Sequence, residues 1–189
     1  MRISLIRACV LLSLSFIGVP LVATTGADAR TAIVVGGTSA PDARYIVDRL
    51  AGFDRVIVVS YPATVIFPSY DVSVAEGKAN LRSALSGVSD DQVVVYGFSQ
   101  GARIAGDVLA EPETVGVTGV LYSDPRQASA GVETQLPFNL PGAAMTGERD
   151  PFVVPVETHC IPRDGVCDWN NHDPLGSIIG YLKHHTTYF

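Results

Sequence analysis

Residues 92–110 have the sequence Gln92-Val-Val-Val-Tyr-Gly-Phe-Ser99-Gln-Gly-Ala-Arg-Ile-Ala-Gly-Asp-Val-Leu-Ala110. The apolar, β-branched run at 93–96 predicts a buried strand, and the apolar residues at helical spacing over 102–110 predict a helix with one apolar face. Between them stands a G-x-S-x-G motif, which turns a strand sharply into a helix and leaves its serine exposed at the end of a sheet. The stretch therefore predicts an α/β fold in which Ser99 lies at the edge of the sheet where a functional site is expected.

Ser99 is the candidate nucleophile. A serine hydroxyl attacks poorly at neutral pH until a base takes its proton, and the free N–H groups at the start of the following helix favour a developing negative charge. Gly97 and Gly101 predict close contact between the turn and neighbouring backbone, where a Cβ would clash. The alternative is a tight strand–helix turn without chemistry in a plain α/β domain.

The first 29 residues predict an export signal. Arg2 and Arg7 flank the start of an almost wholly apolar run at 8–22, and Ala27-Asp-Ala29 supplies a small-residue cleavage pattern, so that Arg30 becomes the first mature residue. The apolar run is too short to favour a permanent transmembrane helix, and an uncleaved anchor is the alternative. We therefore expect a secreted protein, compatible with association with the cell envelope, whose residues 30–189 form a single domain.

Composition excludes some classes of function. The chain of 189 residues has a formal net charge of −6 and no basic patch, so nucleic acid is not an expected partner. Cys160 and Cys167 remain after the signal, and in an oxidising compartment we expect them to pair. His159 and His172 would complete a set of four zinc ligands, but their spacing fits no common zinc pattern. We therefore expect no metal and no cofactor.

Strand and helix signals alternate along the chain. Mostly apolar strands that alternate with helices predict a parallel sheet covered on both faces, and sites in such sheets lie beyond the carboxyl ends of the strands. Gly37-Thr38, Ser99 and the segment after His159 fall at that edge. Strands are expected at 31–35, 56–60, 93–96, 115–122 and 153–159, and helices at 41–50, 73–85, 102–110 and 175–183.

A serine hydrolase also needs a base and an acid, which follow the serine in α/β-hydrolases in the order Ser, then Asp or Glu, then His. The residues alone leave several candidates for each role. The acids are Asp150, Asp164, Asp168 and Asp173, and the histidines are His159, His172, His184 and His185.

Four motifs resemble those of the cutinase-like serine esterases and of the PE-PPE-domain hydrolases related to them. They are Gly37-Thr-Ser39, G-F-S-Q-G at 97–101, C-x₃-D-x₂-C at 160–167 and H-x-x-Y at 185–188; the run Ser123-Asp-Pro125 is also similar to the G-D-P segment of PE-PPE hydrolases. The resemblance covers about residues 31–189, and the C-x₃-D-x₂-C match is its most specific part. It implies a three-layer sandwich with a central, mostly parallel sheet.

The resemblance also implies a role for each motif. It gives a catalytic set and two oxyanion-hole donors, namely Ser99 as nucleophile, Asp164 as acid, His185 as base, and the backbone N–H groups of Thr38 and Gln100. The disulfide between Cys160 and Cys167 would then hold the loop that presents the acid. Asp150 and His184 are the alternatives for acid and base.

By resemblance, the expected reaction is hydrolysis of carboxylic esters of short to medium acyl chains. Such substrates include lipid esters and are compatible with transient contact with a lipid surface. Apolar loop residues near the sheet edge are expected to line the groove, namely Tyr61, Ile66, Phe67, Phe152, Val153, Leu175 and Ile178. A binding module with a degenerate hydrolase fold and an acyltransferase that uses the same three residues are the alternatives.

Overall fold

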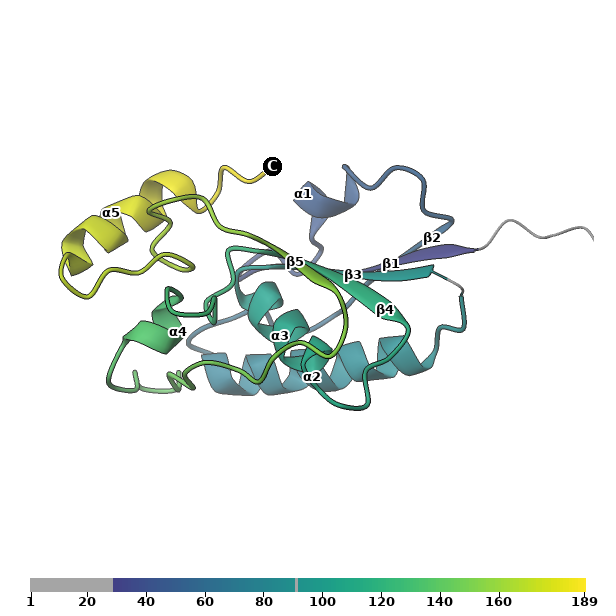
Figure 1. The fold of residues 1–189 in the computed structure, drawn as a ribbon, viewed down its shortest axis with the longest axis horizontal. Coiled ribbons are helices and arrows are strands. Elements are labelled where there is room, and N and C mark those ends of the chain that lie inside the picture. The colour runs from purple at the N-terminus through teal and green to yellow at the C-terminus, as the bar shows by residue number, and fades with distance from the viewer. Residues whose placement is uncertain (1–28, 91) are drawn as a thin grey trace, which may run out of the picture.

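The computed structural model describes residues 29–90 and 92–189. The expected export signal lies outside this range except for its last residue, Ala29. Within the described part of the chain, no helix is both long enough and apolar enough to span a membrane. Strands and helices alternate from one end to the other (Figure 1). They are β1 (Arg30–Val35), α1 (Arg44–Val47), β2 (Arg55–Val58), α2 (Tyr70–Ser86), β3 (Gln92–Phe98), α3 (Gln100–Leu109), β4 (Val117–Tyr122), α4 (Val132–Gln135), β5 (Val156–His159) and α5 (Pro174–His184).

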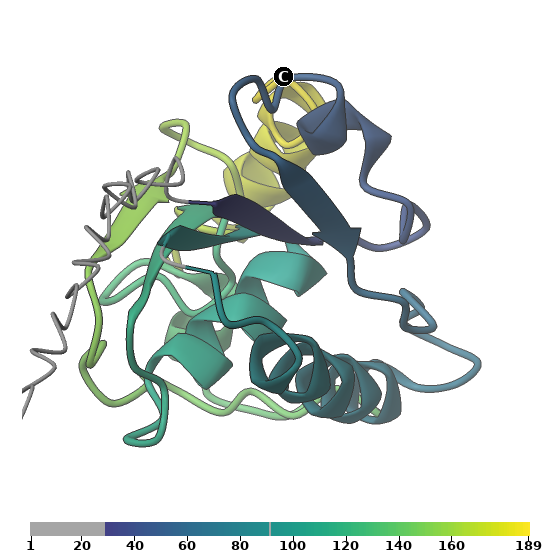
Figure 2. The same cartoon turned by 90° about the vertical axis from the view of Figure 1, so that its right-hand side faces the viewer.

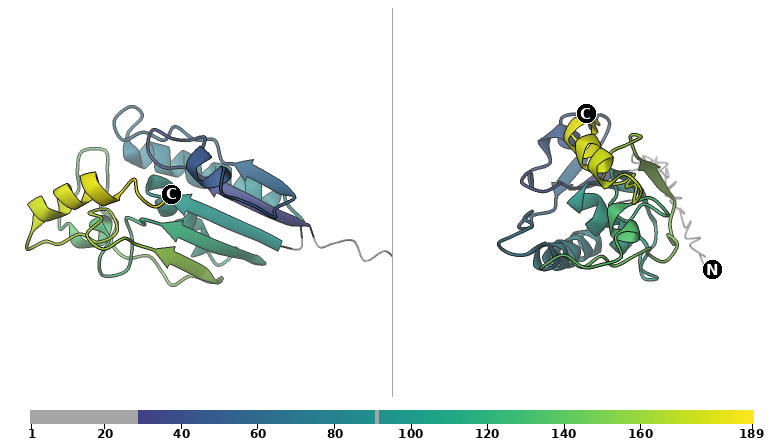
Figure 3. Two further views of the ribbon diagram at one scale, coloured as in Figure 1. Left: turned by 90° about the horizontal axis from the view of Figure 1, so that it is seen from above. Right: turned by 90° about the vertical axis from the view of Figure 1, so that its left-hand side faces the viewer.

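The five strands form one parallel sheet in the order β2-β1-β3-β4-β5, and Figure 3 shows them side by side. The expected parallel α/β sandwich is confirmed. With this order the chain crosses from β1 to β2 in one direction and from β3 to β4 in the other, which opens a crevice beyond the carboxyl ends of β1 and β3. Thr38 follows β1 and Ser99 follows β3, so both residues lie at that crevice.

Helices α2 and α3 cover one face of the sheet, and α1 with the C-terminal residues covers the other (Figures 1 and 2). Neighbouring residues of β1 point to opposite faces, as strand geometry requires. Val35 packs in one apolar cluster with Leu81 of α2 and Ile104 of α3, whereas Val34 packs in a second cluster with Ile46 of α1. Because both faces are covered, the central strands β1 and β3 consist largely of buried apolar residues.

Two expected elements are shorter than the sequence pattern predicts. The helix expected at 41–50 is reduced to α1, because Ala43 has a φ of 50° and this left-handed conformation cannot continue an α-helix. The strand expected at 153–159 begins only at Val156, because Pro155 has no N–H to donate to the sheet. The other expected strands and helices are present, with ends that differ by a few residues.

Candidate active site

Ser99 lies in the sharp turn between β3 and α3. Its φ of 55° and ψ of −120° are strained for a residue with a side chain, and its N–H donates to the Tyr122 carbonyl at 3.0 Å. A Cβ at Gly97 would come within 2.7 Å of the Gly101 carbonyl, and one at Gly101 within 2.1 Å of the Val35 carbonyl. The prediction that both glycines permit close backbone contact is therefore confirmed.

His185 comes directly after α5 and reaches Ser99 from the other side of the crevice. Its Nε2 lies 2.9 Å from Ser99 Oγ, and its Nδ1 lies 3.1 Å from Asp164 Oδ2 and 3.2 Å from Oδ1. The His185 ring stacks on Phe98, with 4.9 Å between the ring centroids. The structure thus brings together the three residues assigned by resemblance, in the relative positions of nucleophile, base and acid.

Asp164 is held in the short loop between Cys160 and Cys167, which a disulfide joins. Its carboxylate is fully buried. It accepts hydrogen bonds from the Ser123 hydroxyl at 2.5 Å, the Tyr188 hydroxyl at 2.8 Å and the Val166 N–H at 3.1 Å. Burial by itself raises the pKa of Asp164, but His185 and these donors outweigh it and hold the pKa below its ordinary value. The group is therefore a stable anion beside the imidazole.

The two hydroxyl donors, Ser123 and Tyr188, were given no role of their own in the sequence analysis. Ser123 lies immediately after β4, is fully buried, and also lies 3.0 Å from His185 Nδ1. Tyr188 accepts from the Ile161 N–H at 2.9 Å while it donates to Asp164. A signal for Ser123 was present, because it begins the Ser123-Asp-Pro125 run that is similar to the G-D-P segment of PE-PPE hydrolases.

The alternative acids lie elsewhere. Asp150 is exposed, in a segment that lines a cavity away from Ser99. Asp173 caps the start of α5 by accepting from the Gly176 N–H at 2.9 Å. Asp168 accepts from the Arg163 N–H at 2.7 Å. These three carboxylates therefore stabilise turns or face solvent, and His185 contacts none of them.

The other histidines are also outside the crevice centre. The His159 ring stacks on Tyr122 with 4.8 Å between centroids, and its Nε2 lies 3.0 Å from Glu157 Oε1. His172 is exposed on the loop before α5. His184 is half-buried, and its neighbour His185 is the one that faces Ser99. Among residues 29–90 and 92–189, no group of three His, Cys, Asp or Glu side chains is placed to hold a metal ion.

The two expected oxyanion donors flank Ser99. Gln100 is the first residue of α3, and its side chain is locked because its Nε2 donates to the Thr64 carbonyl at 2.9 Å. Its Oε1 accepts from the Thr38 hydroxyl at 3.3 Å, which joins the two loops. Within the described residues, neither the Thr38 nor the Gln100 backbone N–H donates a hydrogen bond. Both N–H groups are thus free to bind a ligand oxygen atom in the cavity that Thr38, Gln100 and Ser99 line.

Two cavities meet at Ser99 and share Thr38, Val65 and Tyr181. One, of about 400 Å³, we call the Gln100 cavity; its apolar wall consists of Val132, Leu136, Leu140, Ala143, Met145 and Val166. The other, of about 490 Å³, we call the His185 cavity; its further lining consists of Ala40, Tyr45, Arg49, Phe98, Thr186 and Phe189. A larger cavity, of about 690 Å³, lies at the opposite, amino-terminal edge of the sheet.

The expected groove lining was wrong in each of its members, since none lines either cavity at Ser99. Tyr61 is buried and donates to the Gly36 carbonyl at 2.5 Å, so it belongs to the core. Phe152 packs against that core and contacts Arg149. The other members are exposed to solvent, namely Ile66, Phe67, Val153, Leu175 and Ile178. Apart from Val166, the actual apolar wall comes from residues 132–145, where the sequence shows no periodicity.

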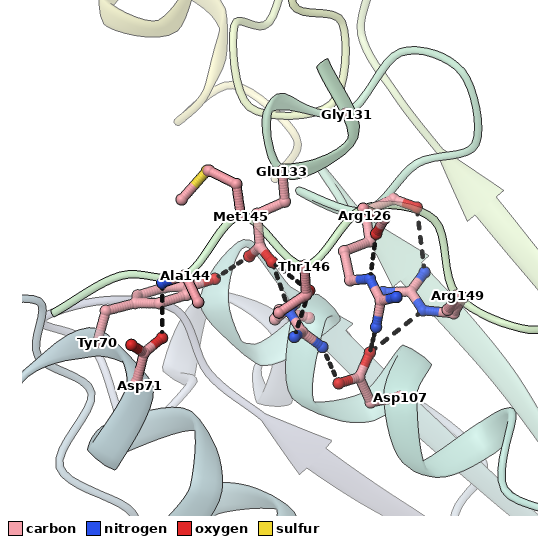
Figure 4. A network of polar contacts seen from close by, with 12 residues as sticks. Tyr70, Asp71, Asp107, Arg126, Gly131, Glu133, Ala144, Met145, Thr146 and Arg149 are labelled. Carbon is pink, nitrogen blue, oxygen red and sulfur yellow. Dashed lines mark hydrogen bonds and ion pairs between the residues drawn. The ribbon is translucent and has the colours of Figure 1, made fainter. Parts of the chain in front are cut away.

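A buried charged network supports that wall (Figure 4). Glu133 of α4 accepts from the Tyr70 hydroxyl at 2.6 Å and from Arg103 Nε at 2.8 Å. Arg103 also contacts Asp107 on α3, which pairs with Arg126 at 2.8 Å. Burial, together with the nearby Glu133 carboxylate, raises the pKa of Tyr70 well above its ordinary value. Because these charged groups are paired with one another, they hold the wall of the Gln100 cavity rather than supply a free acid or base.

Comparison with known proteins supports the resemblance. Residues 54–146 match the PE-PPE domain family model. An uncharacterized PPE family protein of Mycobacterium tuberculosis (strain CDC 1551 / Oshkosh), PPE42, is 28% identical over 202 aligned residues. The alignment covers 88% of this chain but 34% of that protein, so the chain spans about a third of the length of this relative.

Three solved structures share the fold. An acetylxylan esterase superposes with a TM-score of 0.51 at 18% identity, over 82% of this chain and 95% of the esterase. A cutinase-like protein from Cryptococcus sp. gives 0.50 at 20%, over 81% and 91%, and lysin B from Mycobacteriophage D29 gives 0.51 at 18%, over 78% and 69%. At these identities the likeness shows that the chain shares the fold of these structures.

Proposed function

We propose that this chain, whose residues 54–146 match the PE-PPE domain family model and whose fold is like that of a cutinase-like protein, is a secreted serine esterase that hydrolyses carboxylic esters of short to medium acyl chains. The observation that carries the proposal is the contact of Ser99 Oγ with His185 Nε2 at 2.9 Å, with the buried Asp164 on the opposite nitrogen of the ring. A strand–helix turn without a catalytic role does not require a buried carboxylate, here Asp164, that is hydrogen-bonded to the histidine beside the serine.

The proposed reaction has two halves. Ser99 Oγ attacks the ester carbonyl while His185 Nε2 takes its proton, and the oxyanion is bound by the N–H groups of Thr38 and Gln100. His185 then gives the proton to the leaving alcohol, which leaves an acyl-serine. A water molecule that gives its proton to His185 attacks that acyl group, and His185 returns the proton to Ser99 Oγ as the bond between Oγ and the acyl carbon breaks and the acid leaves. Asp164 orients the ring and stabilises the imidazolium in both halves. This route uses no metal or cofactor.

The site of action and the substrate class rest on further observations. The disulfide beside Asp164 is of a kind that persists in oxidising compartments, which supports export through residues 1–29 and a mature domain at 30–189. The Gln100 cavity, at about 400 Å³, falls in the size range of small-molecule sites and is walled by aliphatic side chains. An acyl chain fits this chemistry, and an ester or lipid is accordingly the expected small-molecule partner.

The test is an assay of p-nitrophenyl esters from acetate to palmitate, with the protein exported into an oxidising compartment. We expect turnover that decreases for the longest acyl chains and that disappears in Ser99→Ala, because the nucleophile is gone. Ser129→Ala, at a serine outside both cavities that also has a positive φ, is the matched control.

Two results would change the proposal. If folded wild-type protein and Ser99→Ala give equal rates on every ester, the esterase proposal is wrong. If Ser99 is acylated but added alcohols accept the acyl group faster than water does, the protein is an acyltransferase with the same three residues. Mass spectrometry of the acyl-enzyme and of the products separates these outcomes.

A further inference from the structure

The two cavities at Ser99 differ in the part of the catalytic machinery that lines them. The Gln100 cavity is lined by Gln100, whose N–H is one of the proposed oxyanion donors, and not by His185. The His185 cavity is lined by His185 and not by Gln100. Thr38, the other proposed oxyanion donor, lines both cavities, so the base is the group that distinguishes them: an ester carbon at Ser99 has His185 beside one cavity only.

This difference assigns the two halves of an ester. His185 Nε2 must hand its proton to the leaving oxygen, so the alcohol half has to lie on the side of the imidazole. The His185 cavity thus receives the alcohol, and the acyl chain enters the aliphatic Gln100 cavity. The step depends on the esterase mechanism proposed above.

The His185 cavity carries a positive charge without an acidic partner. Arg49 is held at its rim, since its Nη1 donates to the Tyr45 carbonyl at 2.7 Å and its guanidinium lies 5.7 Å from the centre of the Phe189 ring. Its described lining contains no Asp or Glu. Among residues 29–90 and 92–189 no carboxylate pairs with Arg49, whereas nearby Arg44 pairs with Asp42 at 3.1 Å.

The contrast with the other cavity is chemical as well as spatial. The single acid that lines the Gln100 cavity, Glu133, already accepts from Tyr70, Arg103 and Thr146. That cavity presents an aliphatic wall to a ligand, whereas the alcohol side presents aromatic rings and a guanidinium with free donors. In a chain with a formal net charge of −6, Arg49 is thus a cation without an acidic partner among the described residues, and it lines the same cavity as Ser99.

We propose that the His185 cavity selects esters whose alcohol half bears an anionic oxygen group, a phosphate or a carboxylate, which Arg49 binds. A guanidinium matches both groups through paired N–H donors. Because Arg49 is exposed at the rim, its contribution is screened by solvent. We expect a preference of about threefold to tenfold over the neutral ester, which decreases as salt is added.

The test compares three butyrate esters with one acyl chain, namely 1-butyryl-glycerol, 1-butyryl-glycerol 3-phosphate and 3-butyryl-glycerate. In wild-type protein we expect kcat/KM to be higher for the anionic esters. Arg49→Gln should bring the ratio of anionic to neutral ester close to one. Arg44→Gln removes a neighbouring, already paired arginine and should keep the wild-type ratio. A preference for either anion that depends on Arg49 supports the proposal, and the two esters tell phosphate from carboxylate.

The proposal is overturned if kcat/KM for the anionic esters does not exceed that for the neutral ester in wild-type protein, or if their ratio is the same in Arg49→Gln. Turnover of the neutral ester would in that case still support the esterase function. A binding measurement tests anion recognition by Arg49 even if the protein hydrolyses no ester. NMR titration of 1-butyryl-glycerol 3-phosphate into Ser99→Ala and into Ser99→Ala/Arg49→Gln reports anion recognition without turnover. Weaker binding in the double variant supports the role of Arg49 even if no ester is hydrolysed.

Discussion

Asp164→Asn tests the proposed acid most directly. The substitution keeps the size of the side chain but removes the negative charge that lies 3.1 Å from His185 Nδ1. With an effective dielectric constant of about 20, a unit charge at this distance stabilises the imidazolium by about 5 kcal/mol. Because each 1.36 kcal/mol is a factor of ten in rate, we expect kcat to fall by about 10⁴-fold, with KM changed little.

Asp150→Asn is the matched control, because Asp150 is the rival acid in the sequence and is exposed away from the crevice. Its kcat on p-nitrophenyl butyrate should stay within about twofold of wild type, as for most exposed substitutions. Circular dichroism and thermal melts verify that both variants are folded. The reasoning is refuted if folded Asp164→Asn keeps a tenth of the activity, or if Asp150→Asn loses as much as Asp164→Asn does.

Three more predictions concern the surroundings of Asp164. Ser123→Ala removes a hydroxyl that contacts both Asp164 and His185. Because a charge-assisted hydrogen bond is worth about 1.5–3 kcal/mol, kcat should fall about tenfold or more at unchanged KM. An unchanged kcat would contradict a positioning role for Ser123. Replacing Cys160 and Cys167 by Ser opens a loop with a sequence separation of 7. Chain entropy predicts that the free energy of unfolding in urea falls by about 2–3 kcal/mol, and kcat should fall as well. Equal urea midpoints for the variant and wild type would show that the disulfide does not constrain the chain. The lowered pKa of Asp164 means that its ionised form stabilises the fold above the ordinary value of 3.8, and that this contribution is lost as pH falls through the lower folded-state value. The Tm of wild type relative to Asp164→Asn should therefore decrease between about pH 5 and about pH 2, and a constant difference would contradict the lowered pKa.

Parallel architecture and the nucleophile turn were predictable from the sequence because their signals are local. Each buried strand consists of a short apolar run, and the turn at Ser99 needs glycine on both sides for contacts that any such turn makes. The same locality explains the errors at the ends of elements. Neither the positive φ of Ala43 nor the start of β5 after Pro155 alters the apolar pattern that predicts a helix or a strand.

The loop at 160–167 could be singled out by its spacing, since two cysteines and an aspartate lie within eight residues. Residue chemistry alone left four acids and four histidines open, and only the resemblance ranked them. Asp164 and His185 come together because β5 sits at the edge of the sheet beside β4 and α5 returns the chain over the crevice. This juxtaposition depends on strand order, which no local pattern encodes.

The cavity lining and the charged network were decided by the tertiary structure alone. Ile66 and Phe67 are apolar and close to the sheet edge, yet they are exposed, whereas the wall of the Gln100 cavity comes from a segment without periodicity. That segment is held by ion pairs such as Arg103–Glu133, which join residues 30 apart. The sequence by itself determined which residues carry reactive groups and where strands turn into helices. Packing decided which of those groups meet, because contacts between distant segments depend on the arrangement of the whole chain.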